Sequence, residues 1–476
     1  MSSIKFGTSG WRGLIARDYT FANVRLAAQG IADYLNAEFK APDSKIAGRK
    51  PLVILGHDTR FLGREFTLAA AEVLEHNGLT PLLCQRDAPT PVIAHTIRAR
   101  KAIGGVNMTA SHNPAEYQGL KFSIYNGAPA PPEITRQIEA HIQRRQDAQW
   151  AFNGATIGTY TCRTFDPQPD YFRQIHRLVD FSIIRKAKLK VAVECMYGTG
   201  RGYLDTLLLA AGTRVTTFHD EINPLFGGHH PEPSAEGMAE VSKFVRSGKA
   251  CIGLGMDGDA DRFGIVDQNG AWLSPNQVLA LTLYHLKKNR GWTGAAVRTV
   301  PTSHMVDAVA AMLGVKLHET PVGFKFIGAL MESEPIIVGG EESGGLSVKG
   351  HVPEKDGILA CLLMAELVSA EGRTLGQILK RLEKEIGAFH TDRINLHIDP
   401  ARKQAILDML AKGLERVGTA KVEQFITTDG FKFILPHGEW VAFRASGTEP
   451  VIRCYIEAKS AAGMKKLTAA CKKLMA

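Results

Sequence analysis

The sequence has few cysteines and no cysteine pair of the C-x-x-C type. Its seven cysteines are odd in number and scattered along the chain. Such a set argues against a disulfide framework, and the missing pairs argue against a zinc cluster. The pattern is typical of reduced thiols in the cytosol.

Long hydrophobic runs are also missing. No apolar stretch approaches the ~18 residues that a membrane-spanning helix needs. The N-terminus lacks a basic segment followed by an apolar one, so no export signal is expected. The sequence contains no low-complexity tract either. We therefore expect a cytoplasmic protein with no membrane partner.

The charge is unbalanced, with 57 Lys and Arg against 48 Asp and Glu, a net charge of +9. A nucleic-acid-binding protein would concentrate this excess in a basic cluster with interleaved aromatic residues. Here the excess is spread thinly along the chain, so a solvated basic surface is favoured and no nucleic-acid partner is expected. Attraction of a small dianionic substrate remains open.

The chain of 476 residues is too long for a single compact core. Three successive blocks alternate short β-rich runs with amphipathic helical patterns, as βαβ units around a mostly parallel sheet do. Their similar order suggests an internal structural repeat. From about residue 390 the pattern is that of a smaller α+β domain with an antiparallel sheet. We predict an α/β protein of four domains, at residues 1–160, 161–268, 269–388 and 389–476.

The expected elements can be given by residue range. Helices are expected at about Glu65–His76, Tyr203–Ala211 and His304–Leu313. Strands of the α/β blocks are expected at Leu52–Leu55, Leu79–Cys84, Val191–Cys195, Val215–His219, Cys251–Leu254, Phe263–Asp267, Ala295–Val300, Val315–Thr320 and Ile336–Gly339. Strands of the last domain are expected at Arg393–Ile398, Val422–Ile426, Phe431–Leu435 and Val451–Ala458.

The sharpest motif is Gly255–Arg262, in which Asp257, Asp259 and Asp261 alternate with small residues. This spacing can bring carboxylate oxygens together around one hard cation. An EF-hand is excluded because positions six and twelve, counted from Asp257, are Arg and Gln. An acidic turn in solvent is the alternative. Three regularly spaced carboxylates favour a Mg²⁺ site with coordination positions left for a phosphate oxygen.

A second motif, Thr109–Pro114, contains Ser111 beside His112 after a small and apolar run. The Asn-Pro pair enforces a turn. A serine on such a turn can act as a nucleophile or carry a phosphoryl group. Taken alone, however, a Ser-His pair on a loop is more often a capped turn.

Two further loops are polar and rich in glycine. In Gly339–Gly345, Glu341 and Ser343 alternate and could bind sugar hydroxyls, but a plain polar loop explains the pattern equally well. Arg444–Pro450, followed by Arg453, combines hydroxyls, glycine N–H groups and guanidinium groups in a compact phosphate cradle. It matches neither a Walker A loop nor G-x-G-x-x-G.

Together and in this order, the four motifs and Gly7–Gly13 near the N-terminus resemble the α-D-phosphohexomutase superfamily, which includes phosphoglucomutases, phosphomannomutases and phosphoglucosamine mutases. The resemblance extends essentially from end to end. It implies three similar α/β domains and a smaller C-terminal α+β domain around a central cleft. It also implies an isomerase that moves a phosphoryl group between C1 and C6 of a small-molecule sugar phosphate. The implied cofactors are one Mg²⁺ and a hexose 1,6-bisphosphate as activator.

The resemblance also implies a role for each site residue. Ser111 resembles the phosphoserine, and one of its phosphate oxygens would complete a Mg²⁺ site made by Asp257, Asp259 and Asp261. Lys121 resembles the general acid/base, which requires a lowered pKa, and His112 could assist it. Arg12 and Arg262 resemble the arginines that face the reacting phosphate. Glu341 and Ser343 resemble the pair that reads the sugar, and Lys325 and His351 lie in segments that resemble substrate-contacting ones. Arg444, Ser446, Gly447, Thr448 and Arg453 resemble the site of the non-reacting phosphate, on a domain that we expect to move as a lid.

The substrate follows less directly. Glu342, within Gly-Glu-Glu-Ser-Gly, resembles the phosphoglucomutase branch, so glucose is favoured over mannose or dual specificity. A Mg²⁺-dependent sugar phosphatase and a non-catalytic sugar-phosphate sensor are the competing classes. The phosphatase would not need a second phosphate cradle, and the sensor would need neither nucleophile nor base. The sequence predicts no oligomeric state.

Overall fold

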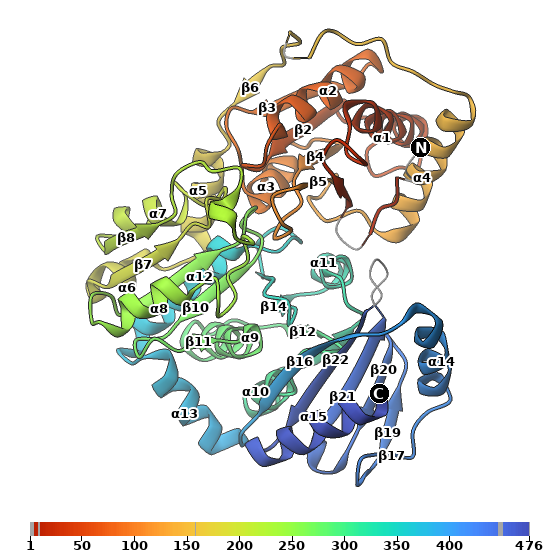
Figure 1. Cartoon of the computed structure of the whole chain (residues 1–476). Helices are drawn as coiled ribbons and strands as arrows, with labels where there is room; N and C mark the ends of the chain where they lie inside the picture. The colour runs from red at the N-terminus through yellow and green to blue at the C-terminus, as the bar shows by residue number, and fades with distance from the viewer. Residues whose placement is uncertain (1–3, 8–9, 158, 446–450, 476) are drawn as a thin grey trace.

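The computed structural model describes residues 4–7, 10–157, 159–445 and 451–475. Four large β-sheets follow one another along the chain, with helices packed against each of them (Figure 1). In this view the first sheet lies at the top, the second at the left, the third near the centre and the fourth at the lower right (Figure 1).

The first sheet has the strand order β1-β5-β4-β2-β3-β6. Its strands are β1 (Trp11–Leu14), β2 (Leu52–His57), β3 (Thr80–Cys84), β4 (Gly104–Met108), β5 (Tyr117–Ile124) and β6 (Thr164–Phe165). Its helices are α1 (Phe21–Lys40), α2 (Gly63–His76), α3 (Thr90–Ala99) and α4 (Pro132–Asp147).

The second sheet has the order β11-β10-β9-β7-β8 and the third the order β13-β12-β14-β15. The second region contains α5 (Gln168–Leu178), α6 (Phe181–Ala187), β7 (Lys190–Glu194), α7 (Leu204–Ala210), β8 (Arg214–Phe218), the short helix η1 (Phe226–Gly228), α8 (Ala239–Arg246), β9 (Ile252–Met256), β10 (Phe263–Val266) and β11 (Trp272–Leu273). The third contains α9 (Pro275–Tyr284), η2 (His285–Asn289), β12 (Ala295–Thr299), α10 (Met305–Met312), β13 (Leu317–Thr320), α11 (Phe324–Ser333), β14 (Ile336–Gly340), β15 (Leu346–Val348), α12 (Gly357–Glu371) and α13 (Leu375–Ile386).

These three sheets repeat one arrangement of four strands. The orders β5-β4-β2-β3, β10-β9-β7-β8 and β15-β14-β12-β13 correspond position by position. In each, the last three strands are parallel and the first is antiparallel to its neighbour. The internal repeat suggested by the sequence is therefore confirmed.

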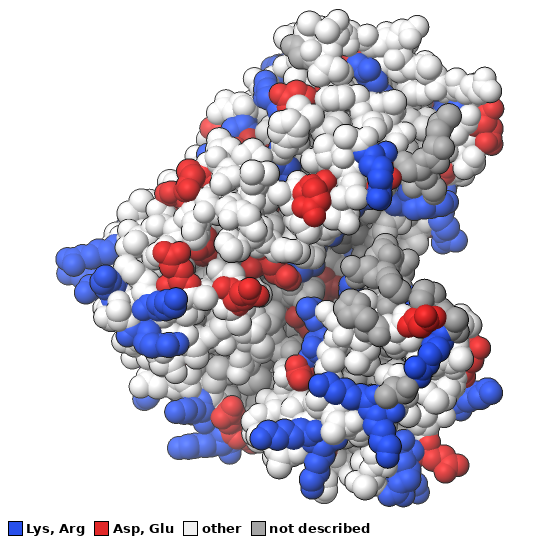
Figure 2. All heavy atoms as spheres, viewed as in Figure 1, with Lys and Arg blue, Asp and Glu red and all other residues white. Residues whose placement is uncertain are grey.

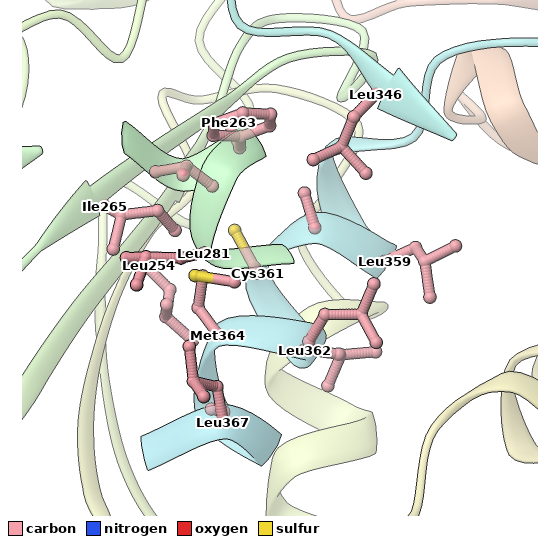
Figure 3. Packing of buried hydrophobic residues seen from close by; sticks show 14 of the residues in the cluster. Leu254, Phe263, Ile265, Leu281, Leu346, Leu359, Cys361, Leu362, Met364 and Leu367 are labelled. Atoms are coloured by element: carbon pink, nitrogen blue, oxygen red, sulfur yellow. The ribbon is translucent and has the colours of Figure 1, made fainter. Parts of the chain in front are cut away.

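Helix α12 is buried on nearly every side between the second and third sheets (Figure 3). Its Met364 lies in one hydrophobic cluster with Leu254 and Ile265 of the second sheet, Leu281 of α9 and Leu346 of β15 (Figure 3). A helix that is apolar over most of its length is typical of a protein interior, and its one fully buried carboxylate, Glu366, is paired with Arg290 at 2.6 Å. The second and third sheets therefore share one core, whereas the first and fourth are built around separate clusters.

The fourth sheet is antiparallel throughout, in the order β16-β22-β21-β20-β19. The C-terminal region contains β16 (His390–His397), α14 (Pro400–Ala411), the hairpin β17 (Arg416–Val417) and β18 (Ala420–Lys421), β19 (Gln424–Ile426), β20 (Phe431–Ile434), η3 (Pro436–Gly438), β21 (Trp440–Ala445), β22 (Val451–Ala458) and α15 (Ala461–Met475). One face of the sheet forms a core with Leu410 of α14 and Leu467 of α15. Lys432 on the other face donates a hydrogen bond to the Val300 carbonyl of the third region.

The predicted fold class is confirmed, but the expected strands do not include β1, β4, β5, β6, β11, β15, β17, β18 and β21. The second half of β5, Leu120–Ile124, does alternate apolar and polar residues as a strand does, but the sequence prediction did not use this short signal. Strand β21 runs into the arginine motif, which was interpreted as a loop from Arg444 onward. The structure instead has Arg444 within β21. All seven cysteines lie within the described residues and are free thiols, as expected.

Candidate active site

Three of the predicted motifs occupy the same position in the repeated topology. Ser111 lies between β4 and β5, the triple-Asp loop between β9 and β10, and Glu341 between β14 and β15. Each loop joins the carboxyl end of a parallel strand to the antiparallel strand beside it, which is where α/β sheets gather ligands. The loops meet, because Phe263 N donates to the Gly344 carbonyl and Ser111 contacts Asp257.

Ser111 is 2% exposed, and its hydroxyl donates to Asp257 Oδ2 at 2.8 Å. His112 Nδ1 lies 3.3 Å from the same hydroxyl oxygen. The Ser111 backbone has a φ of 53°, a left-handed conformation that costs free energy for a non-glycine residue. Its N–H is held by Thr109 Oγ1 at 2.8 Å. The loop therefore fixes the serine at the carboxylates.

Arg60 holds the Ser111 loop through backbone carbonyl groups, although no pattern in the sequence points to this residue. Its guanidinium donates to the carbonyl oxygens of Ser111 at 2.7 Å and Tyr117 at 3.0 Å. Asp58 balances the buried charge through a 3.1 Å contact from Arg60 Nε. Only a planar fork of several donors can hold so many carbonyls at once.

The three aspartates form the cluster of potential metal ligands in the described part of the chain. Asp257, Asp259 and Asp261 are buried, and one ligand atom from each lies within 4.8 Å of the others. Asp259 Oδ1 and Asp261 Oδ1 have no hydrogen-bond partner among the residues that the structure describes. Buried carboxylate oxygens without partners are costly, and an all-oxygen donor set suits Mg²⁺. The residues therefore fit the ion.

The charges around the cluster are strongly coupled. Burial, with the charges of Asp259 and Asp261, raises the pKa of Asp257 well above its usual range. Burial would also raise the pKa of Asp261, but the ammonium groups of Lys121 and Lys355 lower it overall. The carboxylates thus repel one another and need positive charge.

Lys121 lies in β5 and reaches Asp259 Oδ2 at 2.6 Å and Asp261 Oδ2 at 2.8 Å. Its role as an acid/base led us to expect a lowered pKa. Burial does act in that direction, but the charges of Asp259 and Asp261 outweigh it and raise the pKa of Lys121. With the triad ionised, Lys121 is therefore a counter-ion.

Lys355 is a site residue that no sequence motif singled out. It lies just before α12, is 6% exposed, and its amino group is 3.2 Å from both Asp261 Oδ2 and Glu354 Oε1. Its pKa is raised, because Asp261 and Glu354 outweigh the effect of burial. The signal in the sequence is a Glu-Lys-Asp run that directly precedes the predominantly apolar helix α12.

Glu341 is buried, and its Oε1 accepts a hydrogen bond from Gly323 N at 2.9 Å. Burial raises the pKa of Glu341 to about 7, against the opposing charge of Lys355. Ser343 lines a cavity of about 330 Å³ together with Arg262 and Tyr455. In the space-filling view the surface is hollowed between the upper part of the molecule and the C-terminal region (Figure 2).

The two cleft arginines come from different regions. Arg12 Nη1 donates to Asn113 Oδ1 at 2.6 Å, and Arg262 Nη1 lies 3.5 Å from Glu232. Burial and the charges of Arg262 and Arg12 hold the pKa of His112 well below its usual range. His112 is therefore neutral beside Ser111 and resists protonation, so it can contribute a hydrogen bond but is a weak base.

Arg444 and Arg453 lie directly opposite each other on β21 and β22. Opposed like charges destabilise a strand pair, so an anion between them would be stabilising. Basic side chains also gather over the C-terminal region on the face shown in Figure 2. Ser446, Gly447 and Thr448, predicted for the same cradle, lie outside the described residues.

Two predicted substrate contacts differ in their surroundings. Lys325, the second residue of α11, is partly buried, and burial lowers its pKa. The side chain of His351 is fully buried, with Nε2 2.8 Å from Asp356 Oδ2, the carboxylate that caps α12. Tyr171 donates to the same oxygen at 2.7 Å. The structure therefore does not bring His351 to the cleft: it is one of the groups around the helix cap.

Comparisons with known proteins cover the whole chain. Models of the phosphoglucomutase/phosphomannomutase α/β/α domains I, II and III match residues 3–149, 169–270 and 274–386, and the model of the C-terminal domain matches 394–474. A phosphoglucomutase/phosphomannomutase of Thermococcus kodakarensis is 31% identical, with 96% of this chain and 94% of that one covered. A phosphoglucomutase of Komagataeibacter xylinus is 30% identical, with 98% and 89% covered.

A probable phosphoglucosamine mutase of Methanothermobacter thermautotrophicus is also 30% identical, over 96% of this chain and 94% of that protein. The crystal structure of a candidate phosphomannomutase from Thermus thermophilus superposes with a TM-score of 0.85 at 31% identity, covering 99% of both chains. These matches define an isomerase of the mutase class. The chain belongs to the phosphoglucomutase/phosphomannomutase family and is a phosphohexomutase. Within the described residues, no helix combines the length and apolarity needed to span a membrane.

Proposed function

We propose that the chain interconverts glucose 1-phosphate and glucose 6-phosphate through phosphorylated Ser111 and a hexose 1,6-bisphosphate. One distance carries the proposal: the Ser111 hydroxyl lies 2.8 Å from Asp257 Oδ2, at the edge of a buried carboxylate cluster that fits Mg²⁺. A serine so held can accept and return a phosphoryl group. Bound at the triad, Mg²⁺ would neutralise the carboxylates and stabilise charge on the transferring phosphoryl oxygens.

Two transfers complete the reaction. The phosphoryl group of Ser111 passes to the free hydroxyl of the sugar, and the Ser111 oxygen regains a proton as the sugar hydroxyl loses one. The bisphosphate then reorients within the cleft, and its other phosphate returns to Ser111. Arg12 and Arg262 would bind the transferring oxygens by charge and hydrogen bonding.

Lys121 would take the proton from the sugar hydroxyl. Asp259 and Asp261 raise its pKa, so this step requires that their charge be offset. Burial and the charge of Lys355 then both lower the pKa of Lys121. Lys355, whose amino group lies close to Asp261, would also stabilise the anionic phosphate through its positive charge.

The sugar and its second phosphate would bind on the other side of the cleft. Glu341 and Ser343 would read the sugar hydroxyls, with Lys325 nearby on the same region. Arg444 and Arg453 would hold the non-reacting phosphate. Because each phosphate must occupy this site in turn, it binds by charge and geometry rather than by sugar detail.

Glucose is supported by Glu342, because its Gly-Glu-Glu-Ser-Gly segment resembles the phosphoglucomutase branch. Mannose or dual specificity is the second candidate, because a relative at 31% identity carries the double name phosphoglucomutase/phosphomannomutase. We further propose a cytoplasmic location, which the free cysteines support. Domain boundaries near residues 160, 268 and 388 are proposed as well, close to the limits of the four matched ranges.

The test is a Mg²⁺-dependent assay on glucose 1-phosphate, mannose 1-phosphate and glucosamine 1-phosphate, each primed with its 1,6-bisphosphate. Glucose 6-phosphate should form fastest, without release of inorganic phosphate. A preference for mannose or glucosamine would overturn the substrate while leaving the mechanism. Release of phosphate without isomer would contradict the mechanism itself.

The pH profile of kcat/KM should have an acidic limb near pH 7 that belongs to Glu341. Its raised pKa of about 7 means that the ionised, hydrogen-bond-accepting form predominates only above that pH. Well below pH 7, kcat/KM should therefore fall about tenfold per pH unit. Glu341→Gln should lose this limb and keep only the titration of the substrate phosphate near pH ~6.

Glu342→Gln is the matched control, because it changes the neighbouring carboxylate and should keep the limb, moved to a lower pH since the charge of Glu342 helps to raise the pKa of Glu341. For both variants, kcat/KM would be measured at saturating Mg²⁺ over about 1.5 pH units on either side of pH 7. A limb near pH 7 that persists in Glu341→Gln would show that another group titrates there.

A further inference from the structure

Asp429 of the C-terminal domain accepts two hydrogen bonds, one from its own domain and one from the segment of the third region that precedes α11. It lies on the turn between β19 and β20. Its Oδ1 accepts from Arg444 Nε at 3.0 Å, and its Oδ2 accepts from the backbone N–H of Val322 at 2.7 Å. The same carboxylate therefore contacts a phosphate-site arginine and a segment of the third region.

The Val322 side of this bridge leads directly to Glu341. The next residue, Gly323, donates its N–H to Glu341 Oε1 at 2.9 Å. Gly323 has a φ of 126°, a conformation that side chains rarely adopt, and α11 begins immediately after it. Two consecutive N–H groups thus point to two carboxylates, one from each side of the cleft.

The turn that carries Asp429 is built for close approach. Gly430 has a φ of 76°, and a Cβ there would lie 2.3 Å from the Phe443 carbonyl oxygen. Only glycine lets the turn lie this close to β21. Asp429 consequently reaches Arg444 from the neighbouring hairpin and orients its guanidinium group.

A second set of contacts lies further along the same sheet face and is more deeply buried. Lys432 is 0% exposed and donates to the Val300 carbonyl at 2.8 Å. Glu457, also 0% exposed, accepts from the His304 N–H at 3.1 Å. By contrast, the Asp429 side chain is 21% exposed at the cleft. The contacts of Lys432 and Glu457 are thus shielded from water, whereas the Asp429 bridge lies at the solvent-facing edge of the same interface.

We propose that Asp429 is a positioning residue that couples Arg444 of the C-terminal domain to Glu341 of the Gly339–Gly345 loop. The phosphate-binding and sugar-binding halves of the substrate site would then be held together during the reaction. The inference rests on the proposed roles of Arg444 and Glu341. Without the bridge, the hexose 1,6-bisphosphate would leave the cleft more often before its second transfer.

Asp429→Asn should break one of the two hydrogen bonds that Asp429 accepts, from Arg444 Nε and from Val322 N. Two donors face the carboxylate, but an amide offers only one accepting oxygen and turns an NH₂ toward the other donor. We expect kcat/KM to fall about 10- to 100-fold, with an unchanged Mg²⁺ requirement. Bisphosphate released per turnover from the phosphorylated enzyme should rise several-fold. Asp408→Asn, an exposed change on α14 of the same domain, is the matched control.

Hydrogen–deuterium exchange supplies a readout that needs no turnover. The peptide containing the amides of Val322 and Gly323 should exchange faster in Asp429→Asn than in the wild type or in Asp408→Asn. Unchanged exchange would overturn the bridge. Faster exchange with unaltered bisphosphate release and kcat/KM would overturn its coupling role. Wild-type protein without mutase activity on any hexose phosphate would contradict the proposed function, whereas the exchange result would stand by itself.

Discussion

Ser111→Ala should lower kcat of the mutase reaction by at least about 10⁴-fold, as removal of a covalent nucleophile does. The variant loses only the oxygen that lies 2.8 Å from Asp257 Oδ2. Alanine keeps the Cβ and has the same left-handed backbone to satisfy, and Arg60 still holds the loop through its carbonyl groups. Folding and sugar-phosphate binding should therefore be retained.

The measurement combines a coupled glucose 6-phosphate assay with phosphate transfer from labelled bisphosphate to the protein. Wild-type chain should carry the label on the peptide containing Ser111, and the variant should carry none. Ser123→Ala, in β5 of the same sheet, controls for loss of a buried hydroxyl away from the carboxylates. Full activity of Ser111→Ala, or label on another residue, would contradict the phosphoserine assignment.

Asp259→Asn should raise the Mg²⁺ concentration needed for half-maximal activity by at least about 100-fold, because it removes a charged metal ligand rather than a supporting partner. The Oδ1 atom of Asp259 has no hydrogen-bond partner among the described residues, so it is available to a cation. Its Oδ2 is held by Thr90 Oγ1 at 2.5 Å and Lys121 Nζ at 2.6 Å. Asparagine preserves the size but leaves only a weak, neutral ligand.

Activity would be titrated against Mg²⁺, and binding of the ion followed by calorimetry. Treatment of the wild type with a chelator should abolish turnover, and added Mg²⁺ should restore it. Asp220→Asn is the matched control, since Asp220 is exposed in the same region and contacts Thr217. An unchanged Mg²⁺ requirement in Asp259→Asn would remove the triad from the metal site.

The α/β repeat could be predicted because its parallel strands are buried on both faces and appear as short apolar runs, such as Leu52–His57. Strands that carry chemistry were harder to find. Strand β5 alternates apolar and polar residues only over Leu120–Ile124, which is a short signal, and it also contains Gln118 and Lys121 in buried positions. Burial of Lys121 is explained only by its partners Asp259 and Asp261 from the second region.

The site was predictable where several functional residues are close in sequence, as in the triple-Asp loop. It was not predictable where single residues act from a distance. Arg60 lies more than 50 residues from the serine loop that it holds, and Asp429 about 107 positions from Val322. His351 shows the opposite error, because a polar residue beside a functional segment belongs instead to the buried cap of α12. The direction of the Lys121 pKa shift depends on the charges of Asp259 and Asp261 beside it. No sequence pattern shows that these residues contact Lys121.

The core around α12 has a consequence for cooperativity. Because one hydrophobic cluster joins the second and third sheets, these two regions should melt together, and the four domains should unfold as three units. The triple-Asp loop, Lys355 and Glu341 all belong to the shared unit and keep their mutual spacing. Ser111 with Lys121, and Arg444 with Arg453, are supplied by the other two units. The site would thus consist of one block, assembled as that core forms, and two further units that complete it when they pack against the block.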